Sequence, residues 1–110
     1  MKREIKNILV VDDEQGICAM LTKFLRSAGY FCNSRTEPVE ALEILKEGAF
    51  DLVISDIQMA GMDGIELLSR IRELSYPIDT IMMTGLTRKY TYSDIIDAGA
   101  ADFIAKPFQL

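Results

Sequence analysis

Ile8-Leu9-Val10-Val11-Asp12-Asp13-Glu14 is a run of four aliphatic residues followed at once by acidic ones. Such a run predicts a short strand whose carboxyl end carries the acids. Charged residues also close two later apolar runs: Asp56 comes two residues after Leu52-Val53-Ile54, and Lys106 comes directly after Phe103-Ile104-Ala105. In an open parallel sheet the carboxyl ends of the strands meet at one edge, and ligands bind there. We therefore expect three carboxylates and one ammonium group to share a small pocket.

Together with further apolar runs along the chain, this stretch predicts a sheet of five strands. In the segments between the runs, apolar residues recur at the spacing of a helix. The strands are expected at residues 5–11, 30–34, 51–55, 78–83 and 101–105. Strands that alternate with helices require a parallel sheet with right-handed crossovers and helices on both faces. The predicted fold class is therefore α/β, with a doubly wound five-stranded parallel sheet.

Four helices are expected between the strands. An apolar stripe predicts the first between residues 14 and 28, with Gly29 as its stop; the stripe consists of Ile17, Leu21, Phe24, Leu25 and Ala28. Pro38 and Gly48 bracket a second helix, which turns Ala41, Leu42 and Leu45 inward. A third begins at Asp63, whose carboxylate can cap it. The fourth is convincing only over residues 94–98, since the residues before it are polar and favour strands.

The alternation breaks at the end of the chain, where residues 106–110 read only as the opening of a fifth helix. With the fifth helix missing or truncated, the first helix alone would cover one face of the sheet. The exposed apolar patch that results is rare in monomers. We therefore expect the chain to be part of a longer protein, or its patch to be covered by a partner or a second copy.

The composition excludes several kinds of function. A formal net charge of −5 gives no electrostatic footprint for nucleic acid. The sequence has no apolar run long enough to cross a membrane and no signal peptide, so we expect a cytoplasmic domain. The absence of histidine excludes imidazole chemistry. Cys18 and Cys32 are expected to be buried apolar groups, and the methionines are expected to pack without a cofactor.

The acids at the strand ends predict a metal site. Neighbouring strands place Asp12 and Asp13 close to Asp56, and clustered carboxylates repel one another unless a cation lies among them. Hard oxygen ligands with room for water suit Mg²⁺. Lys106 and Thr84 end two further strands and would offer an ammonium and a hydroxyl to an incoming phosphoryl group.

These motifs together resemble the receiver domain of two-component response regulators, the CheY-like superfamily, over the whole chain. The resemblance rests on the segments Ile8 to Glu14, Asp51 to Met59, Met82-Met83-Thr84-Gly85 and Phe103 to Phe108. It implies the flavodoxin-like strand order 2-1-3-4-5 and a domain spanning residues 1–110, the N-terminal part of a longer response regulator. It also implies a phosphorylation-dependent signalling switch that catalyses only its own phosphorylation and dephosphorylation.

The resemblance also assigns roles to individual residues. Asp56 would accept phosphate from a sensor histidine kinase or a phosphotransfer protein, helped by Lys106 and Thr84. Asp13 would bind Mg²⁺, or Mn²⁺ in its place, directly and Asp12 through water, together with Asp56 and the backbone carbonyl of Gln58. Thr84 and Phe103 would act as the switch pair that controls a C-terminal output domain or a homodimer, and the Lys106–Pro107 bond would be cis. One departure from the family is Ala60, where proline is frequent.

Other interpretations are compatible with parts of the pattern. Asp12 and Asp13 alone could cap a helix, and Asp56 with Lys106 could form a structural ion pair, but their joint occurrence at strand ends favours a site. A degenerate receiver would mediate contacts without phosphate. A small magnesium-dependent phosphatase would also use a strand-end aspartate, but Asp13-Glu14-Gln15-Gly16 does not supply the Asp-x-Asp-x-Thr pattern that such an enzyme has. A flavodoxin-like cofactor carrier would require a glycine-rich phosphate loop where the acidic pair stands.

Overall fold

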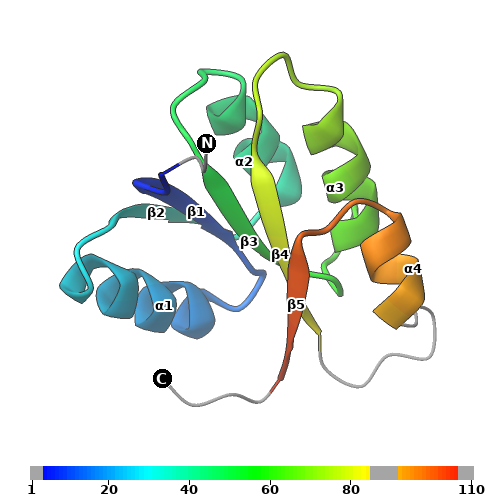
Figure 1. Ribbon diagram of the computed structural model, residues 1–110. Coiled ribbons are helices and arrows are strands. Elements are labelled where there is room, and N and C mark those ends of the chain that lie inside the picture. The colour runs from blue at the N-terminus through cyan, green and yellow to red at the C-terminus, as the bar shows by residue number, and fades with distance from the viewer. Residues whose placement is uncertain (1–3, 85–91, 107–110) are drawn as a thin grey trace.

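The apolar runs form the strands of one sheet in the computed structural model, which describes residues 4–84 and 92–106. The strands are β1 (Asn7–Val11), β2 (Phe31–Arg35), β3 (Leu52–Asp56), β4 (Asp79–Thr84) and β5 (Asp102–Ala105). All neighbouring strands are parallel, in the order β2-β1-β3-β4-β5 (Figure 1). The doubly wound sheet and its order are therefore confirmed, and each strand lies within two residues of its predicted bounds.

The helices α1 (Gln15–Ser27), α2 (Pro38–Leu45), α3 (Gly64–Arg72) and α4 (Tyr92–Asp97) lie between the strands, as predicted. Helix α4 begins two residues earlier and ends one residue earlier than the predicted range 94–98. Gly29 follows α1 with a φ of 101°, a left-handed conformation that glycine adopts without strain and that ends the helix. The Asp63 carboxylate caps α3 by accepting a hydrogen bond from the Glu66 backbone at 2.9 Å. The expected opening of a fifth helix and the Lys106–Pro107 bond involve residues outside the described part of the chain.

Helices α2, α3 and α4 cover one face of the sheet (Figure 1). Leu9, Val11 and Val53 of the central strands pack there against Ala41, Leu45, Leu67 and Ile71 of α2 and α3. Beside them, Met82 of β4 packs with Leu68 of α3 and Ile95 of α4. Because the central strands are apolar on both sides, their carboxyl ends are held rigidly in place.

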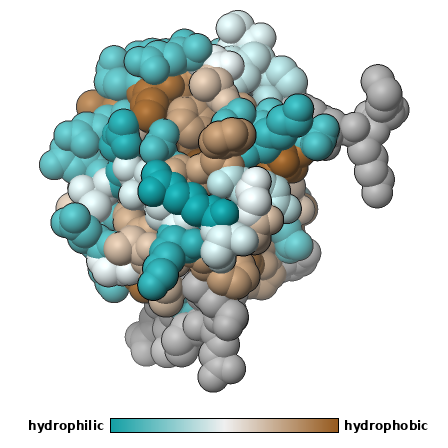
Figure 2. Space-filling view, turned by 90° about the vertical axis from the view of Figure 1, so that its left-hand side faces the viewer, coloured by the Kyte–Doolittle hydropathy of each residue, from teal (hydrophilic) through white to brown (hydrophobic). Residues whose placement is uncertain are grey.

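Among the described residues, α1 alone covers the opposite face. Cys18 and Leu21 bury its inner side against Ile8, Val10 and Ile54. Phe24 and Ala28 were also predicted to lie in this stripe, but Phe24 is 43% exposed and Ala28 is exposed as well, so the prediction is wrong for these two residues. The buried side of α1 contains Cys18 instead. The side of the molecule that carries α1 and β2 shows apolar patches among hydrophilic side chains (Figure 2).

Buried sulfur-containing side chains have the structural role expected of them. Cys18 and Cys32 are free thiols in the core under α1. Met59, Met82 and Met83 are buried in the three apolar clusters of the domain. These residues fill space between the sheet and its helices.

Candidate functional site: a carboxylate cluster at the carboxyl edge

Asp12 lies directly after β1 and is completely buried. One of its carboxylate oxygens, Oδ1, accepts a hydrogen bond from the Glu14 backbone at 2.9 Å. The other, Oδ2, lies 2.7 Å from Nζ of Lys106, which comes directly after β5. A buried carboxylate is costly unless it is hydrogen-bonded and paired with a cation, and both conditions are met here.

Asp56 is the last residue of β3 and shares the same lysine. Its Oδ2 lies 3.3 Å from Lys106 Nζ, and its side chain is almost buried. Parallel pairing of β1 with β3 brings the two acidic strand ends together, as Ser55 is in register with Val11, the residue before Asp12. The lysine, which comes from the far edge strand β5, therefore bridges two aspartates from the centre of the sheet.

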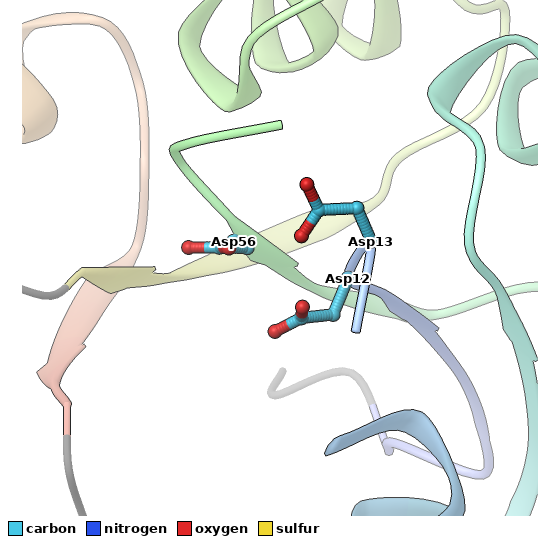
Figure 3. A group of neighbouring side chains, drawn as sticks. All are labelled: Asp12, Asp13 and Asp56. Carbon is cyan, nitrogen blue, oxygen red and sulfur yellow. The ribbon is translucent and has the colours of Figure 1, made fainter. Parts of the chain in front are cut away.

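Asp13 completes a group of three carboxylates. One ligand oxygen from each of Asp12, Asp13 and Asp56 can be chosen so that all lie within 4.8 Å of one another. Figure 3 shows the side chains of Asp12 and Asp13, from the end of β1, on the same side of the sheet edge as Asp56. Asp13 is exposed, whereas the other two are buried. The cluster thus has one open side and oxygen donors only, a donor set that suits a hard divalent cation.

Burial raises the pKa of the Asp56 carboxyl above its ordinary value, and the negative charge of Asp12 adds to this effect. The charge of Lys106 and a hydrogen bond from the Gln58 backbone act in the opposite direction without cancelling it. Burial alone would lower the pKa of Lys106, but its hydrogen bond to Asp12 and the charge of Asp56 raise it overall. The lysine therefore stays protonated, and a second cation among the carboxylates would be electrostatically favourable.

Three other residues predicted for the site lie around this cluster. Gln58 lies in the loop after β3 and its backbone reaches the Asp56 carboxylate. Thr84 ends β4 in register with Ala105 of β5, but its side chain lies outside the described part of the structure. Phe103 of β5 is partly buried against the cluster of Ile57, Leu68, Met82, Ile95 and Ala100.

Two further residues next to the site, Ser55 and Gly64, were not among those predicted from the sequence. Ser55 is fully buried, and its hydroxyl donates to the Asp56 backbone carbonyl at 2.9 Å. Its signal was a polar residue inside an otherwise apolar strand. Gly64 is the first residue of α3 and lies directly against the Asp56 backbone. A single glycine after a helix cap carries no recognisable signal of such a contact.

Comparison with known proteins identifies the class to which this fold and site belong. The protein-family model described as the response regulator receiver domain matches residues 8–110. The transcriptional regulatory protein ZraR of Klebsiella oxytoca is 39% identical over 107 residues, which are 97% of this chain and 24% of that protein. Sporulation initiation phosphotransferase F of Bacillus subtilis is 33% identical over 105 residues, 96% of this chain and 85% of that protein.

A solved structure has the same fold as this chain and covers most of it. It is a response regulator of Burkholderia pseudomallei, described with a phosphorylated aspartic acid, a calcium ion and citrate. It superimposes with a TM-score of 0.85 at 25% identity, covering 94% of this chain and 61% of that one.

The chain belongs to the response regulator receiver domain family. Members of this family are phosphorylation-dependent signalling domains rather than typical enzymes. The chain spans about a quarter of the length of the ZraR proteins that it matches. In the described part of the chain, no helix combines the length and apolar character needed to cross a bilayer.

Proposed function

We propose that Asp56 is the phosphoacceptor of this receiver domain. The observation that carries this proposal is the position of its carboxylate, almost buried at the end of β3, 3.3 Å from Lys106 Nζ and within 4.8 Å of the Asp12 and Asp13 carboxylates. An acceptor must sit where the negative charge of the transferring group is compensated, and this cluster is such a place. The phosphorylated aspartate described for the Burkholderia relative supports the same chemistry.

The reaction is transfer of a phosphoryl group to a carboxylate oxygen. As the Asp56 Oδ–phosphorus bond forms, the bond between phosphorus and the donor nitrogen of a phosphohistidine, or the donor oxygen of a small acyl phosphate, breaks. Lys106, held between Asp12 and Asp56, is within a short movement of a phosphoryl oxygen on Asp56. Its ammonium group offsets the added negative charge and keeps the group aligned. The domain thereby assists its own phosphorylation and, with water as the nucleophile, its dephosphorylation.

The residues present fit a divalent ion of the magnesium type. Asp13 would hold it directly, Asp12 through water, and Asp56 and the Gln58 carbonyl would complete the protein ligands, with Mn²⁺ as an alternative ion. The open side at Asp13 leaves room for the water ligands that Mg²⁺ retains. When bound, the ion supplies charge neutralisation and orientation for the phosphoryl oxygens.

We infer that phosphate on Asp56 draws Lys106 and the Thr84 hydroxyl toward its new acceptor oxygens. Lys106 directly follows β5, and Phe103 on that strand packs against α4, so a pull at the site reaches the α4 side of the sheet. Phe103 then turns in the space next to Thr84. The α4 and β5 surface is the proposed readout of the switch.

The expected setting is a cytoplasmic two-component system. A sensor histidine kinase or a phosphotransfer protein would supply the phosphoryl group, and residues 1–110 would form the receiver part of a longer response regulator. The ZraR relatives, of which this domain matches only about a quarter, support an attached output domain. Homodimer formation would be one form of that output.

The proposal is tested with Asp56→Asn. Wild-type protein incubated with Mg²⁺ and acetyl phosphate is expected to gain one phosphoryl mass, labile to base, and the variant to gain none. Circular dichroism of the variant should match the wild type, because the amide fits the space of the carboxylate. A phosphorylated Asp56→Asn protein would contradict the assignment, and an unreactive wild type that still binds Mg²⁺ would favour a phosphate-independent interaction module.

A further inference from the structure

Gly64, at the start of α3, lies directly against the backbone of Asp56. Its backbone N–H donates to the Ile57 carbonyl at 2.7 Å. A Cβ placed on Gly64 would lie 2.3 Å from the Asp56 carbonyl oxygen, 2.7 Å from Ile57 Cα and 2.6 Å from Met82 Cε. Any side chain at position 64 would therefore collide with the backbone of the acceptor residue itself.

The atoms that such a side chain would meet are held on several sides. Asp56 is in register with Met83 of β4, and the Ile57 backbone donates to the Met83 carbonyl at 3.0 Å. Ile57 and Met82 are both buried in the cluster that α3 and α4 share. Backbone atoms in a close-packed sheet do not yield as a flexible side-chain end does. Relief of the collision must come from the start of α3, the loop before it or the peptide at Asp56.

Each of these movements alters the proposed site. The loop of residues 57–63 carries Gln58, and its two ends are joined by the Gly64 to Ile57 hydrogen bond. Moving a Cβ from 2.3 Å to an ordinary contact requires a displacement on the order of 1 Å, enough to cost about 100-fold in a reaction that depends on alignment. Asp56 and Gln58 would take up that displacement, because Asp56 is itself contacted and Gln58 directly follows the contacted Ile57.

We propose that Gly64 is a positioning residue for phosphoryl transfer: the absence of a side chain lets α3 seat against the Asp56 backbone and fixes the acceptor carboxylate relative to the Gln58 carbonyl. This inference rests on the proposed function of Asp56. Gly64 is not required for a left-handed conformation, since the positive-φ glycines are Gly29, Gly48, Gly61 and Gly99. Its role is therefore close approach, not backbone freedom.

Two matched variants separate positioning from stability. Gly16→Ala makes the same substitution in α1, where an added Cβ would meet nothing within 4 Å. Asp63→Ala removes the cap that receives the Glu66 N–H, and so weakens α3 without placing an atom against Asp56. Gly64→Ala is compared with both, in the wild-type sequence and in a Thr80→Val background. That background should be more stable, because the Thr80 hydroxyl is buried with no hydrogen-bond partner in the described structure.

The measurements are the rate of phosphorylation by acetyl phosphate, the Mg²⁺ affinity from backbone amide shifts, and the urea midpoint. Gly64→Ala is expected to slow phosphorylation by about tenfold or more and to weaken Mg²⁺ binding. Asp63→Ala should lower the urea midpoint but keep the wild-type phosphorylation rate and Mg²⁺ affinity. Gly16→Ala should also keep the wild-type phosphorylation rate and Mg²⁺ affinity.

A Gly64→Ala protein with the wild-type phosphorylation rate and Mg²⁺ affinity would overturn the inference. So would a Gly64→Ala protein that, at the same stability as Asp63→Ala, loses no more rate and affinity than Asp63→Ala does. If wild type itself takes no phosphate, the proposed function fails. The Mg²⁺ titration then still decides whether Gly64 positions the carboxylate cluster.

Discussion

Lys106 is the residue on which the electrostatics of the site depend. In the described part of the chain, Lys106 pairs with both Asp12 and Asp56, and Asp12 is completely buried. Lys106→Met should lower the free energy of unfolding by roughly 3 kcal/mol, because it leaves a buried carboxylate without its cation. Urea denaturation in EDTA measures the loss, and added Mg²⁺ should recover part of it.

The matched control is Lys46→Met. Lys46 pairs with Glu43 at 3.5 Å on the surface, where both side chains are mostly exposed, so its loss should cost less than about 1 kcal/mol. Equal effects of the two substitutions would show that Lys106 is not an essential partner of the buried acid.

Thr80 offers a prediction of the opposite sign. Its hydroxyl oxygen is buried and, within the described structure, has no hydrogen-bond partner. Thr80→Val keeps the shape and removes an unsatisfied polar atom, so it should raise the free energy of unfolding by about 1 kcal/mol. Thr22→Val is the control, because the Thr22 hydroxyl accepts a hydrogen bond from the Cys32 thiol. A Thr80→Val protein less stable than wild type would mean that the hydroxyl has a partner.

Burial raises the pKa of the Cys32 thiol above 9.0, although the Thr22 hydroxyl and the charge of Arg26 act against this effect. The folded protein therefore binds the thiol proton more tightly than the unfolded chain. The stability that this contributes is present below the pKa of the unfolded thiol and is lost as pH rises through the folded value. Iodoacetamide labelling, mapped by mass spectrometry, should be slower at Cys32 in native protein than in urea, with a pH midpoint shifted upward. Equal midpoints would contradict this.

At the scale of elements, the strands and the site edge were predictable because both depend on local signals. Apolar runs set the strands, and the charged residues that end them, Asp12, Asp13, Asp56 and Lys106, mark the edge where they meet. The packing of α1 was less predictable. Its period allowed Phe24 to face inward, but in the structure Cys18 is buried against the sheet, its thiol 3.2 Å from the Asp12 carbonyl oxygen, and Phe24 is exposed. Tertiary contacts between different elements, such as that of Gly64 with the Asp56 backbone, are not predicted by any local sequence pattern.

The edge strand β2 has a protection that only the structure reveals. In the parallel pairing of β2 with β1, the backbone N–H and C=O groups of Cys32 and Ser34 face away from β1, toward the open edge of the sheet. Arg26 of α1 donates to the Cys32 carbonyl from Nε at 3.0 Å and from Nη2 at 2.8 Å. Arg35 donates to the Ser34 carbonyl at 2.7 Å. Unpaired edge groups invite another strand, so these guanidinium groups cap the edge.

The double variant Arg26→Ala, Arg35→Ala should therefore self-associate more than wild type, as measured by sedimentation velocity at increasing concentration. Lys46→Ala with Arg70→Ala is the control, because it removes the same number of positive charges and both residues form exposed ion pairs on the surface. Equal sedimentation of the two double variants would show that net charge, rather than the capped carbonyls, controls association.

At the scale of the whole molecule, the two faces of the sheet are unequally covered. Of the described helices only α1 lies on one face, and apolar side chains there remain open to solvent: Met20, Phe24 and Ile104 are 40%, 43% and 41% exposed. Apolar surface of this kind favours contact with another copy. The 110-residue chain should therefore sediment as a concentration-dependent mixture, and Phe24→Glu should shift it toward monomer. Phe31→Glu, at a still more exposed phenylalanine of β2, is the control. A monodisperse monomer at all concentrations would contradict this.

The most direct test of Asp56 as a phosphoacceptor is intact mass, with backbone NMR, after incubation with Mg²⁺ and acetyl phosphate. A single phosphoryl adduct that maps to Asp56 is expected. Amide shifts should spread from the site to β5 and α4, along the path from Lys106 to Phe103. An adduct on another residue, or an adduct on Asp56 without shifts beyond the loop of residues 57–63, would contradict the proposed switch.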